Sequence, residues 1–310
     1  MSGYLVLVLC AVPAAFLLFL AAAALRGGRR AAAAAAVSFP LCAVLGFVLA
    51  KLSYVLLAEA RNIVEWGEWD ALFSPEPRTF CFTGGGIGVW LGLQLSARIT
   101  RFRPAGTLRD LFAVPGALLV AGLRMAESRL GALGTGRFVG MASGQPAPLM
   151  TVVNQYGEVH VAVFAWEAAT AAAVAVLSFA GRPGRPGARF DTAVFRLCAC
   201  QILLENMRSQ ALSWGFVRVE QLICAAVMEV LALAACSRNV KRQGSVRFLP
   251  ALWLSACFAA IVGIEFLRQR SPSRFMGETG GFLLTGAVLA AALLLYRSLT
   301  AGPRCRARNR

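Results

Sequence analysis

The chain has 310 residues, of which 58% are apolar, and its mean hydropathy of +0.66 is far above that of soluble domains. Apolar runs recur along the whole length, so the composition excludes an ordinary soluble domain and predicts a polytopic membrane protein. A net charge of +16 would favour nucleic-acid binding in a soluble protein. Here most arginines lie in short segments between apolar runs, where they set topology and meet anionic headgroups. We therefore expect membrane lipid, and not nucleic acid, as a partner.

The predicted fold class is an all-α helical bundle of about seven to nine transmembrane helices, because a bilayer crossing needs ~20 apolar residues. The first apolar run has no basic residue before it and no clear cleavage site, so we interpret it as a retained helix. The fourth and sixth spans are the weakest, since one is short and the other carries Gln201 and Glu205. The predicted spans are residues 4–25, 32–57, 82–99, 111–123, 159–179, 192–207, 214–235, 249–266 and 281–295.

Basic residues occupy every second connection between these spans, and the positive-inside rule places such connections in the cytoplasm. Residues 59–78 carry five acids against Arg61 and Arg78, so this segment is expected to face outward. The N-terminus is then outside and the C-terminus inside. The basic connections contain Arg26, Arg29 and Arg30; Arg98, Arg101, Arg103 and Arg109; Arg182, Arg185 and Arg189; Arg238, Lys241, Arg242 and Arg247; and the arginines of the C-terminal tail.

Two longer connections are expected to be ordered. Residues 59–79 contain Trp66 and Trp69 with acids around them, which is typical of a short helix lying at the membrane interface. Residues 139–159 mix aromatic and polar residues, which favours an ordered flap over a disordered loop.

The stretch at residues 123–138 follows the fourth span and is expected at the outer face. Charged groups at membrane depth are costly, so they indicate a site. Gly134 and Gly136 would let the backbone approach a ligand, and a guanidinium fork suits a phosphate. The alternative interpretation is a helix end with interfacial, snorkelling arginines. The charged residues are Arg124, Glu127, Arg129 and Arg137.

Other polar residues within spans allow two interpretations each. Gln201, Glu205 and Arg208 are spaced to share one helical face, where they would form either a site or an interhelical hydrogen-bond patch. Residues 84–86 are glycines at the start of the third span, for which close helix packing is the alternative. His160, the one histidine, is interpreted as an ordinary interfacial residue.

The nine cysteines are scattered, mostly within apolar runs, without a CxxC pair or a histidine at metal-binding spacing. They are expected to be small core residues, and neither a metal nor another cofactor is expected.

Several segments, taken in order, resemble one known family. Residues 44–55, ending near Tyr54, look like its second helix. Phe82-Thr83-Gly84-Gly85-Gly86-Ile87-Gly88 resembles its Phe-His-Gly-Gly-Leu-Ile-Gly motif. Arg124, Glu127 and Gly136-Arg137 resemble its Gly-Arg-x-Gly-Asn-Phe-x-Asn-x-Glu-x-x-Gly-Arg signature. Trp166-Glu167 is similar to its Tyr-Glu pair, and Gln201-x-x-x-Glu205-x-x-Arg208 to its Arg-x-x-x-Glu-x-x-Arg. The family is prolipoprotein diacylglyceryl transferase. The resemblance covers most of residues 1–236, leaving 237–310 as an additional helical segment with a basic tail.

The resemblance implies a transferase of the bacterial plasma membrane with its active face outward. It would move diacylglyceryl from phosphatidylglycerol to the lipobox cysteine of a prolipoprotein, releasing glycerol phosphate. Its substrates would be its partners, and no cofactor is implied. Glu127, Glu205 and Thr83 would take the catalytic positions. The phospholipid-binding positions would be Arg124, Arg137, Gly136, Arg208, Gln201, Gly84, Gly85 and Tyr54.

This chain departs from the family at three of these positions. The family histidine is Thr83, its second essential arginine is Gln201, and its signature asparagine is Glu127. The site is then either rebuilt around Glu127, Arg137, Glu205 and Arg208, or the chain is a non-catalytic relative that binds lipid or signal peptide. A membrane transporter with Lys51, Glu167 and Glu205 along its pathway is a third possibility.

Overall fold

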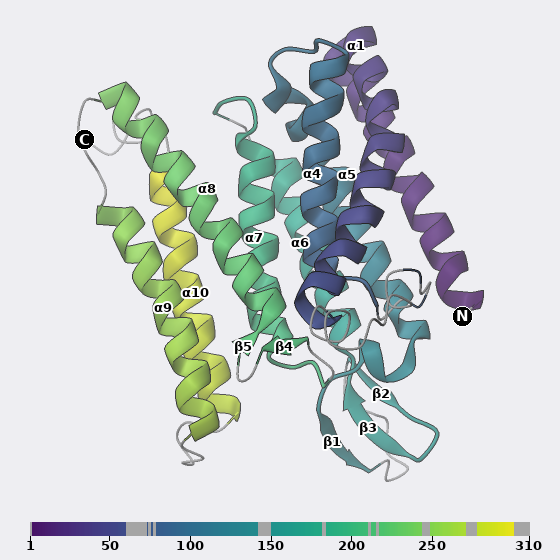
Figure 1. The fold of residues 1–310 in the computed structure, drawn as a ribbon, viewed down its shortest axis with the longest axis vertical. Helices are drawn as coiled ribbons and strands as arrows, with labels where there is room; N and C mark the ends of the chain where they lie inside the picture. Colours follow the sequence, from purple (N-terminus) through teal and green to yellow (C-terminus); the bar gives the residue numbers. More distant parts are fainter. Residues whose placement is uncertain are drawn as a thin grey trace. The chain divides into compact units, whose positions relative to one another are not determined.

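The computed structural model describes residues 2–59, 73, 76, 79–141, 150–181, 184–209, 212–214, 217–243, 249–270 and 278–300. These residues are overwhelmingly helical, with five short strands (Figure 1). Among them, five stretches are long and apolar enough to cross a membrane, which confirms the expectation of a helical membrane protein. The five stretches are Gly3–Leu57, Ala105–Arg129, Val163–Ala180, Val219–Arg238 and Gly280–Thr300.

Every predicted span coincides with a helix. Two spans were predicted to begin too early, because residues 159–161 belong to a strand and Trp214 belongs to another. The predicted interfacial helix with Trp66 and Trp69 lies almost entirely outside the described residues. The helices are α1 (Ser2–Tyr54), α4 (Phe82–Ile99), α5 (Ala105–Ala126), α6 (Val163–Ala180), α7 (Ala188–Glu205), α8 (Val219–Gln243), α9 (Leu249–Arg270) and α10 (Glu278–Thr300).

The chain packs as two compact units. The first comprises Met1–Ala193 and Met207–Leu212, and the second comprises Val194–Asn206 and Ser213–Arg310. The boundary therefore crosses α7, whereas the sequence resemblance placed a boundary at residue 236.

Helix α1 is a hairpin of two helices. A straight helix of its 53 residues would be about 80 Å long, against a hydrocarbon core of about 30 Å. Gly28 has φ +73° and ψ −172°, a conformation that favours glycine, and the chain reverses there (Figure 1). The rings of Phe16 and Phe39 consequently lie with centroids 4.3 Å apart. The arginines at positions 26, 29 and 30 flank this turn, as the basic connection after the first predicted span requires.

Helix α4 packs against the second half of α1 through glycines four residues apart. A Cβ atom at Gly84 would lie 2.4 Å from Ser53 Oγ, and one at Gly88 would lie 2.2 Å from the Leu45 carbonyl oxygen. Only glycine permits helices to approach so closely. Close helix packing, the alternative left open for the glycines at residues 84–86, therefore explains Gly84.

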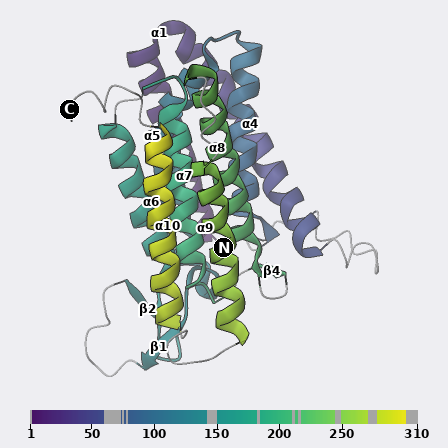
Figure 2. The ribbon, with the colours of Figure 1, turned by 90° about the vertical axis from the view of Figure 1, so that its left-hand side faces the viewer.

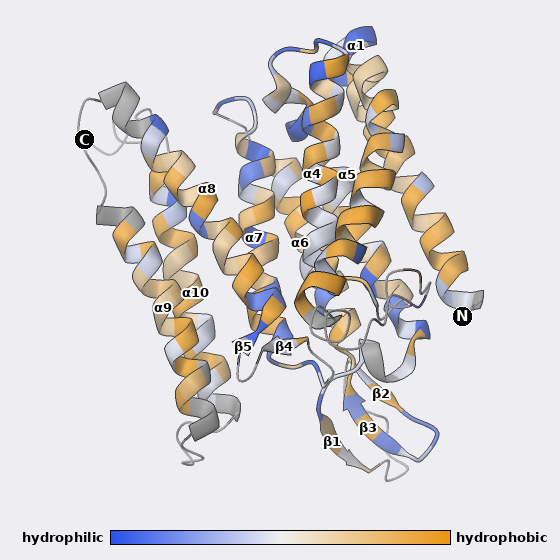
Figure 3. Cartoon of the chain, viewed as in Figure 1, coloured by the Kyte–Doolittle hydropathy of each residue, from blue (hydrophilic) through white to orange (hydrophobic). Residues whose placement is uncertain are grey.

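The basic end of the first unit is held together by two acids, Asp110 near the start of α5 and Asp191 near the start of α7. Asp110 accepts hydrogen bonds from the backbone N–H groups of Gly187 (2.7 Å) and Phe190 (3.0 Å). Asp191 forms ion pairs with Arg109 and Arg185, each at 3.4 Å. Figure 3 shows hydrophobic residues along the helices and hydrophilic ones concentrated near their ends.

A small antiparallel sheet follows α5 and precedes α6. Its strands are β1 (Phe138–Met141), β2 (Thr151–Val153) and β3 (Glu158–Val161), in the order β1-β3-β2. Phe138 pairs with His160, and a shift in register follows before Gly140 pairs with Val159. These strands confirm the expectation of an ordered flap for the described part of residues 139–159. Residues 142–149 lie outside the described part of the chain.

In the second unit, α8, α9 and α10 lie side by side (Figures 1 and 2). The core that they form with the later part of α7 includes Ile202, Met228 and Leu254, and the rings of Phe195 and Tyr296 stack at 3.9 Å. A two-stranded ribbon of β4 (Ser213–Trp214) and β5 (Val217–Arg218) precedes α8.

Candidate functional site: a ring of two arginines and two glutamates

Four charged side chains of the first unit form a closed ring of ion pairs, which we call the Arg–Glu ring. Arg124 binds Glu127 at 2.5 Å, and Glu127 binds Arg208 at 2.6 Å. Arg208 binds Glu167 at 2.5 Å, and Arg124 Nε lies 3.3 Å from the same Glu167 oxygen. Each charge therefore faces two opposite charges.

Four separate elements supply the ring. Arg124 lies in the last turn of α5, and Glu127 begins the 3₁₀ helix η3 (Glu127–Arg129) directly after it. Glu167 projects from the second turn of α6, and Arg208 follows the end of α7. Helix α4 contributes a cation–π contact, because the Arg124 guanidinium lies 3.8 Å from the centre of the Phe82 ring.

The ring has an inner and an outer side. The side chains of Arg124 and Glu167 are each 3% exposed, whereas those of Glu127 and Arg208 are 16% and 11% exposed. Burying an isolated charge costs several kcal/mol, so the inner pair is tolerable only because the ring is complete. Glu127 is the more accessible carboxylate and contacts both arginines, which makes it the counter-ion that a ligand could displace.

Glycines hold the chain beside the ring by close backbone contact. A Cβ at Gly134 would lie 2.7 Å from the Glu127 carbonyl oxygen, and one at Gly136 would lie 2.3 Å from the Met207 carbonyl oxygen. Gly136 and Arg208 form an isolated antiparallel bridge. From the sequence, Gly134 and Gly136 were expected to bring the backbone close to a ligand. In the structure they bring it close to the backbone of Glu127 and Met207.

Of Gln201, Glu205 and Arg208, only the first two lie within helix α7. Helix α7 ends at Glu205, so the helical spacing that the prediction assumed stops before Arg208. Arg208 instead joins the Arg–Glu ring. Gln201 donates to Glu205 Oε2 at 2.9 Å and lies 3.4 Å from Glu220 Oε2 at the start of α8, as expected of an interhelical polar patch.

The remaining predicted site residues lie in three places. Thr83 Oγ1 is 3.2 Å from Cys81 Sγ at the start of α4, and a Cβ atom at Gly85 would lie 3.4 Å from Ala50 Cβ. Tyr54 ends α1, with the Lys51 ammonium 6.0 Å from its ring. Arg137 is exposed between Gly136 and β1, and its backbone N–H donates to Met207.

Two residues outside the predicted catalytic and phospholipid-binding positions, Glu167 and His160, gain importance in the structure. Glu167 binds both arginines, and the signal that points to it is an acid alone in the apolar run of α6. His160 Nδ1 lies 3.2 Å from the Gly136 carbonyl oxygen and Nε2 lies 3.3 Å from Glu158 Oε2. Both neighbours are acceptors, so a neutral imidazole can donate to only one of them.

At the sheet, the hydrogen bond donated by Asn154 (2.6 Å) holds the pKa of Glu158 below its usual value, and contact with His160 adds to the effect. Within the described part of the chain, no three histidine, cysteine or acidic side chains are arranged to hold a metal ion. Comparison with protein-family models, curated proteins and solved structures gives no match to this chain.

Proposed function

We propose that this chain is a divergent prolipoprotein diacylglyceryl transferase of the bacterial plasma membrane, with the Arg–Glu ring as its phosphodiester site. The observation that carries the proposal is a pair of buried arginines bridged by a more accessible carboxylate. The cluster lies beside the C-terminal end of α5, away from Arg109 and Asp110 near the start of that helix. The ordered sequence resemblance supplies the substrate class.

The ring supports a mechanism in which the substrate exchanges with Glu127. With both glutamates in place the ring has no net charge, so a phosphodiester must displace one carboxylate to bind Arg124 and Arg208. Glu127, released from the two arginines, is then available to accept a proton. Glu127 would thus take the role of the histidine in the resembled family's motif, a position at which this chain has Thr83.

The chemical step balances with these groups alone. Glu127 takes the proton of the lipobox thiol, and the thiolate attacks the diacylglyceryl carbon bonded to the phosphate oxygen. The carbon–oxygen bond breaks, and glycerol phosphate leaves with the electron pair. Arg124 and Arg208 stabilise the charge on that leaving group.

The proposal includes an orientation. The basic turns at residues 26–30, 98–109 and 182–189 would face the cytoplasm, and the Arg–Glu ring and three-stranded sheet would face outward. The two halves of α1 together with the seven remaining long helices would give nine crossings, with the N-terminus outside and the C-terminus inside.

The test is transfer from labelled phosphatidylglycerol to a lipobox peptide by the purified protein. We expect Glu127→Gln to lower the rate by about 10²–10⁴-fold, the usual contribution of a general base, while lipid binding persists. Arg124→Ala should abolish both transfer and binding. Glu158→Gln, an exposed acid of the sheet, is the matched control and should retain transfer. Wild-type transfer rates in both Arg124→Ala and Glu127→Gln would refute the proposal.

A second candidate is a non-catalytic relative that binds lipid or signal peptide on the same scaffold. The complete internal neutralisation of the ring favours it, because a resting site without net charge is also what a purely structural cluster would show. This alternative predicts bound phosphatidylglycerol without product. Formation of diacylglyceryl peptide would exclude it.

A further inference from the structure

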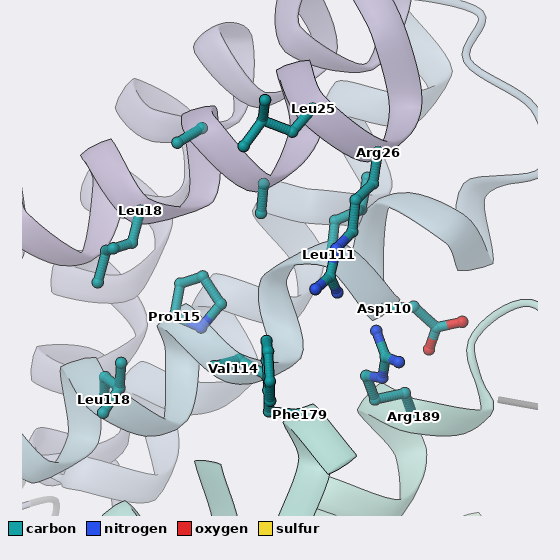
Figure 4. A pocket seen from close by; sticks show the side chains of 12 residues that line it. Leu18, Leu25, Arg26, Asp110, Leu111, Val114, Pro115, Leu118, Phe179 and Arg189 are labelled. Atoms are coloured by element: carbon teal, nitrogen blue, oxygen red, sulfur yellow. The ribbon is translucent and has the colours of Figure 1, made fainter. Parts of the chain in front are cut away.

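A second feature of the first unit lies at its basic end. A crevice of about 260 Å³ opens there between the first half of α1, α5, the end of α6 and the start of α7 (Figure 4). Its walls are almost entirely apolar, and the charged residues among its described lining are Arg26, Asp110 and Arg189. The apolar lining residues are Leu18, Ala21, Ala22, Leu25, Leu111, Val114, Pro115, Leu118 and Phe179.

The crevice opens toward the surroundings of the helices. Leu18, Leu25 and Phe179 are 50%, 87% and 62% exposed, so its rim presents apolar side chains outward. In a membrane such a rim meets acyl chains. The volume is below the roughly 300–1,000 Å³ of a pocket that encloses a whole small molecule, and suits part of a chain entering from the side.

The two cations converge on this crevice. Arg26 reaches down from α1, with its guanidinium 5.4 Å from the Phe179 ring, and Arg189 reaches in from α7 (Figure 4). Arg189 donates through Nη2 to the Gly181 carbonyl oxygen at 2.8 Å, while its buried Nε–H makes no hydrogen bond to any described residue. Neither arginine forms an ion pair with a described acid, and the Asp110 carboxylate accepts from two backbone N–H groups.

We propose that this crevice is a binding site for an anionic phospholipid. The phosphate lies between Arg26 and Arg189, and one acyl chain runs along Leu18, Val114 and Leu118. Basic pockets between membrane helices bind anionic headgroups because each cation near the surface contributes about fivefold in affinity, corresponding to ~1 kcal/mol. The site is separate from the Arg–Glu ring: Asp110 and Arg124 are 14 residues apart on α5, about 21 Å along the helix. It does not depend on the proposed transferase activity.

The experiment measures binding of phosphatidic acid and of phosphatidylcholine to the full-length protein in non-ionic detergent by native mass spectrometry. Phosphatidic acid is chosen because its phosphate monoester is not the group of the proposed transfer substrate. We expect the wild type to prefer phosphatidic acid. Arg26→Gln should weaken that binding about fivefold and the Arg26→Gln, Arg189→Gln double variant about thirtyfold. Because Arg26 is exposed, its variant is expected to fold normally.

The matched control is the Arg30→Gln, Arg103→Gln double variant, which removes two exposed charges that do not line the crevice. We expect it to retain the preference. Ala22→Leu, which occupies the apolar part of the crevice without altering charge, should also weaken binding of phosphatidic acid. Equal losses in the control and crevice variants, an unaffected Ala22→Leu, or no preference for the anionic lipid would each overturn the proposal.

Discussion

Replacing Glu167 by glutamine tests whether the Arg–Glu ring holds the first unit together. The substitution keeps the side-chain shape and one acceptor oxygen but removes the charge that faces Arg124 and Arg208. Within the ring, the two arginines would then share the carboxylate of Glu127, so one positive charge of the ring loses its counter-ion beside an Arg124 side chain that is 3% exposed. Removing one partner of a buried ion pair lowers the free energy of unfolding by about 3–5 kcal/mol. Because the glutamine keeps one acceptor oxygen, we expect a loss of about 3 kcal/mol for Glu167→Gln.

The free energy of unfolding is measured by reversible denaturant titration in mixed micelles. Glu127→Gln provides the internal comparison, because its side chain is 16% exposed against 3% for Glu167, so water can partly replace the lost carboxylate. We expect it to destabilise the protein less than Glu167→Gln does. Glu158→Gln, at 42% side-chain exposure, is the control and should destabilise the protein less than Glu167→Gln does. A Glu167→Gln protein that unfolds within 0.5 kcal/mol of the wild type, the usual range of surface substitutions, would refute the structural role of the ring.

Two further predictions concern the segment and sheet beside the ring. Gly136→Ala should destabilise the protein by about 1–3 kcal/mol, because the new Cβ would lie 2.3 Å from the Met207 carbonyl oxygen. Gly140→Ala meets nothing within 4 Å and should be tolerated, so equal effects in both variants would contradict this reasoning. Asn154→Ala should raise the pKa of Glu158 toward 4.5, which a carbon-13 NMR titration of that carboxyl would detect. Because the pKa of Glu158 is lower in the folded state, its charged form stabilises the fold above the unfolded-state pKa, and this stabilisation is lost as the pH falls through the folded-state pKa. An unchanged pKa of Glu158 in Asn154→Ala would exclude the hydrogen bond.

The helices could be predicted from sequence because their signals are local. The glycine-rich run from Phe82 and the arginines around residue 100 delimit α4 at both ends, and the predicted and observed bounds agree. The turn at Gly28 was anticipated from three nearby arginines. The strand Glu158–Val161 was missed because its apolar residues continue without a break into α6, so the hydropathy of the run reads as one span.

The ring could be predicted only in part, because its closure depends on contacts distant in sequence. The pairing of Arg124 with Glu127 is a local i, i+3 contact, and both residues were singled out from their position at a helix end. Arg208 contacts Glu127 across 81 residues and Glu167 across 41, and no periodicity reports such distances. Helical spacing could not predict the place of Arg208, because it cannot show that α7 ends three residues earlier.

The glutamine at position 201 offers a test of whether the family arginine could simply be restored. Its side-chain amide donates to Glu205 at 2.9 Å and lies 3.4 Å from Glu220, so position 201 faces two carboxylates. An arginine there would be neutralised by both acids and would have little charge left for a phosphate. We therefore expect Gln201→Arg to give no gain in transfer or lipid binding.

The same two carboxylates predict the effect of a side chain at position 201 that cannot donate a hydrogen bond. Gln201→Met is close in length but cannot donate, so it should cost about 1.5–3 kcal/mol, the contribution of hydrogen bonds to charged groups. Gln201→Arg should unfold at higher denaturant than Gln201→Met, because it keeps donors facing Glu205 and Glu220. A tenfold rise in transfer by Gln201→Arg would contradict this argument, since it would require the arginine to reach lipid phosphate in preference to the two carboxylates beside it. The expected result instead implies that the acidic surroundings of position 201 would leave an arginine there little charge for a phosphate, so that the proposed phosphate chemistry depends on Arg124 and Arg208.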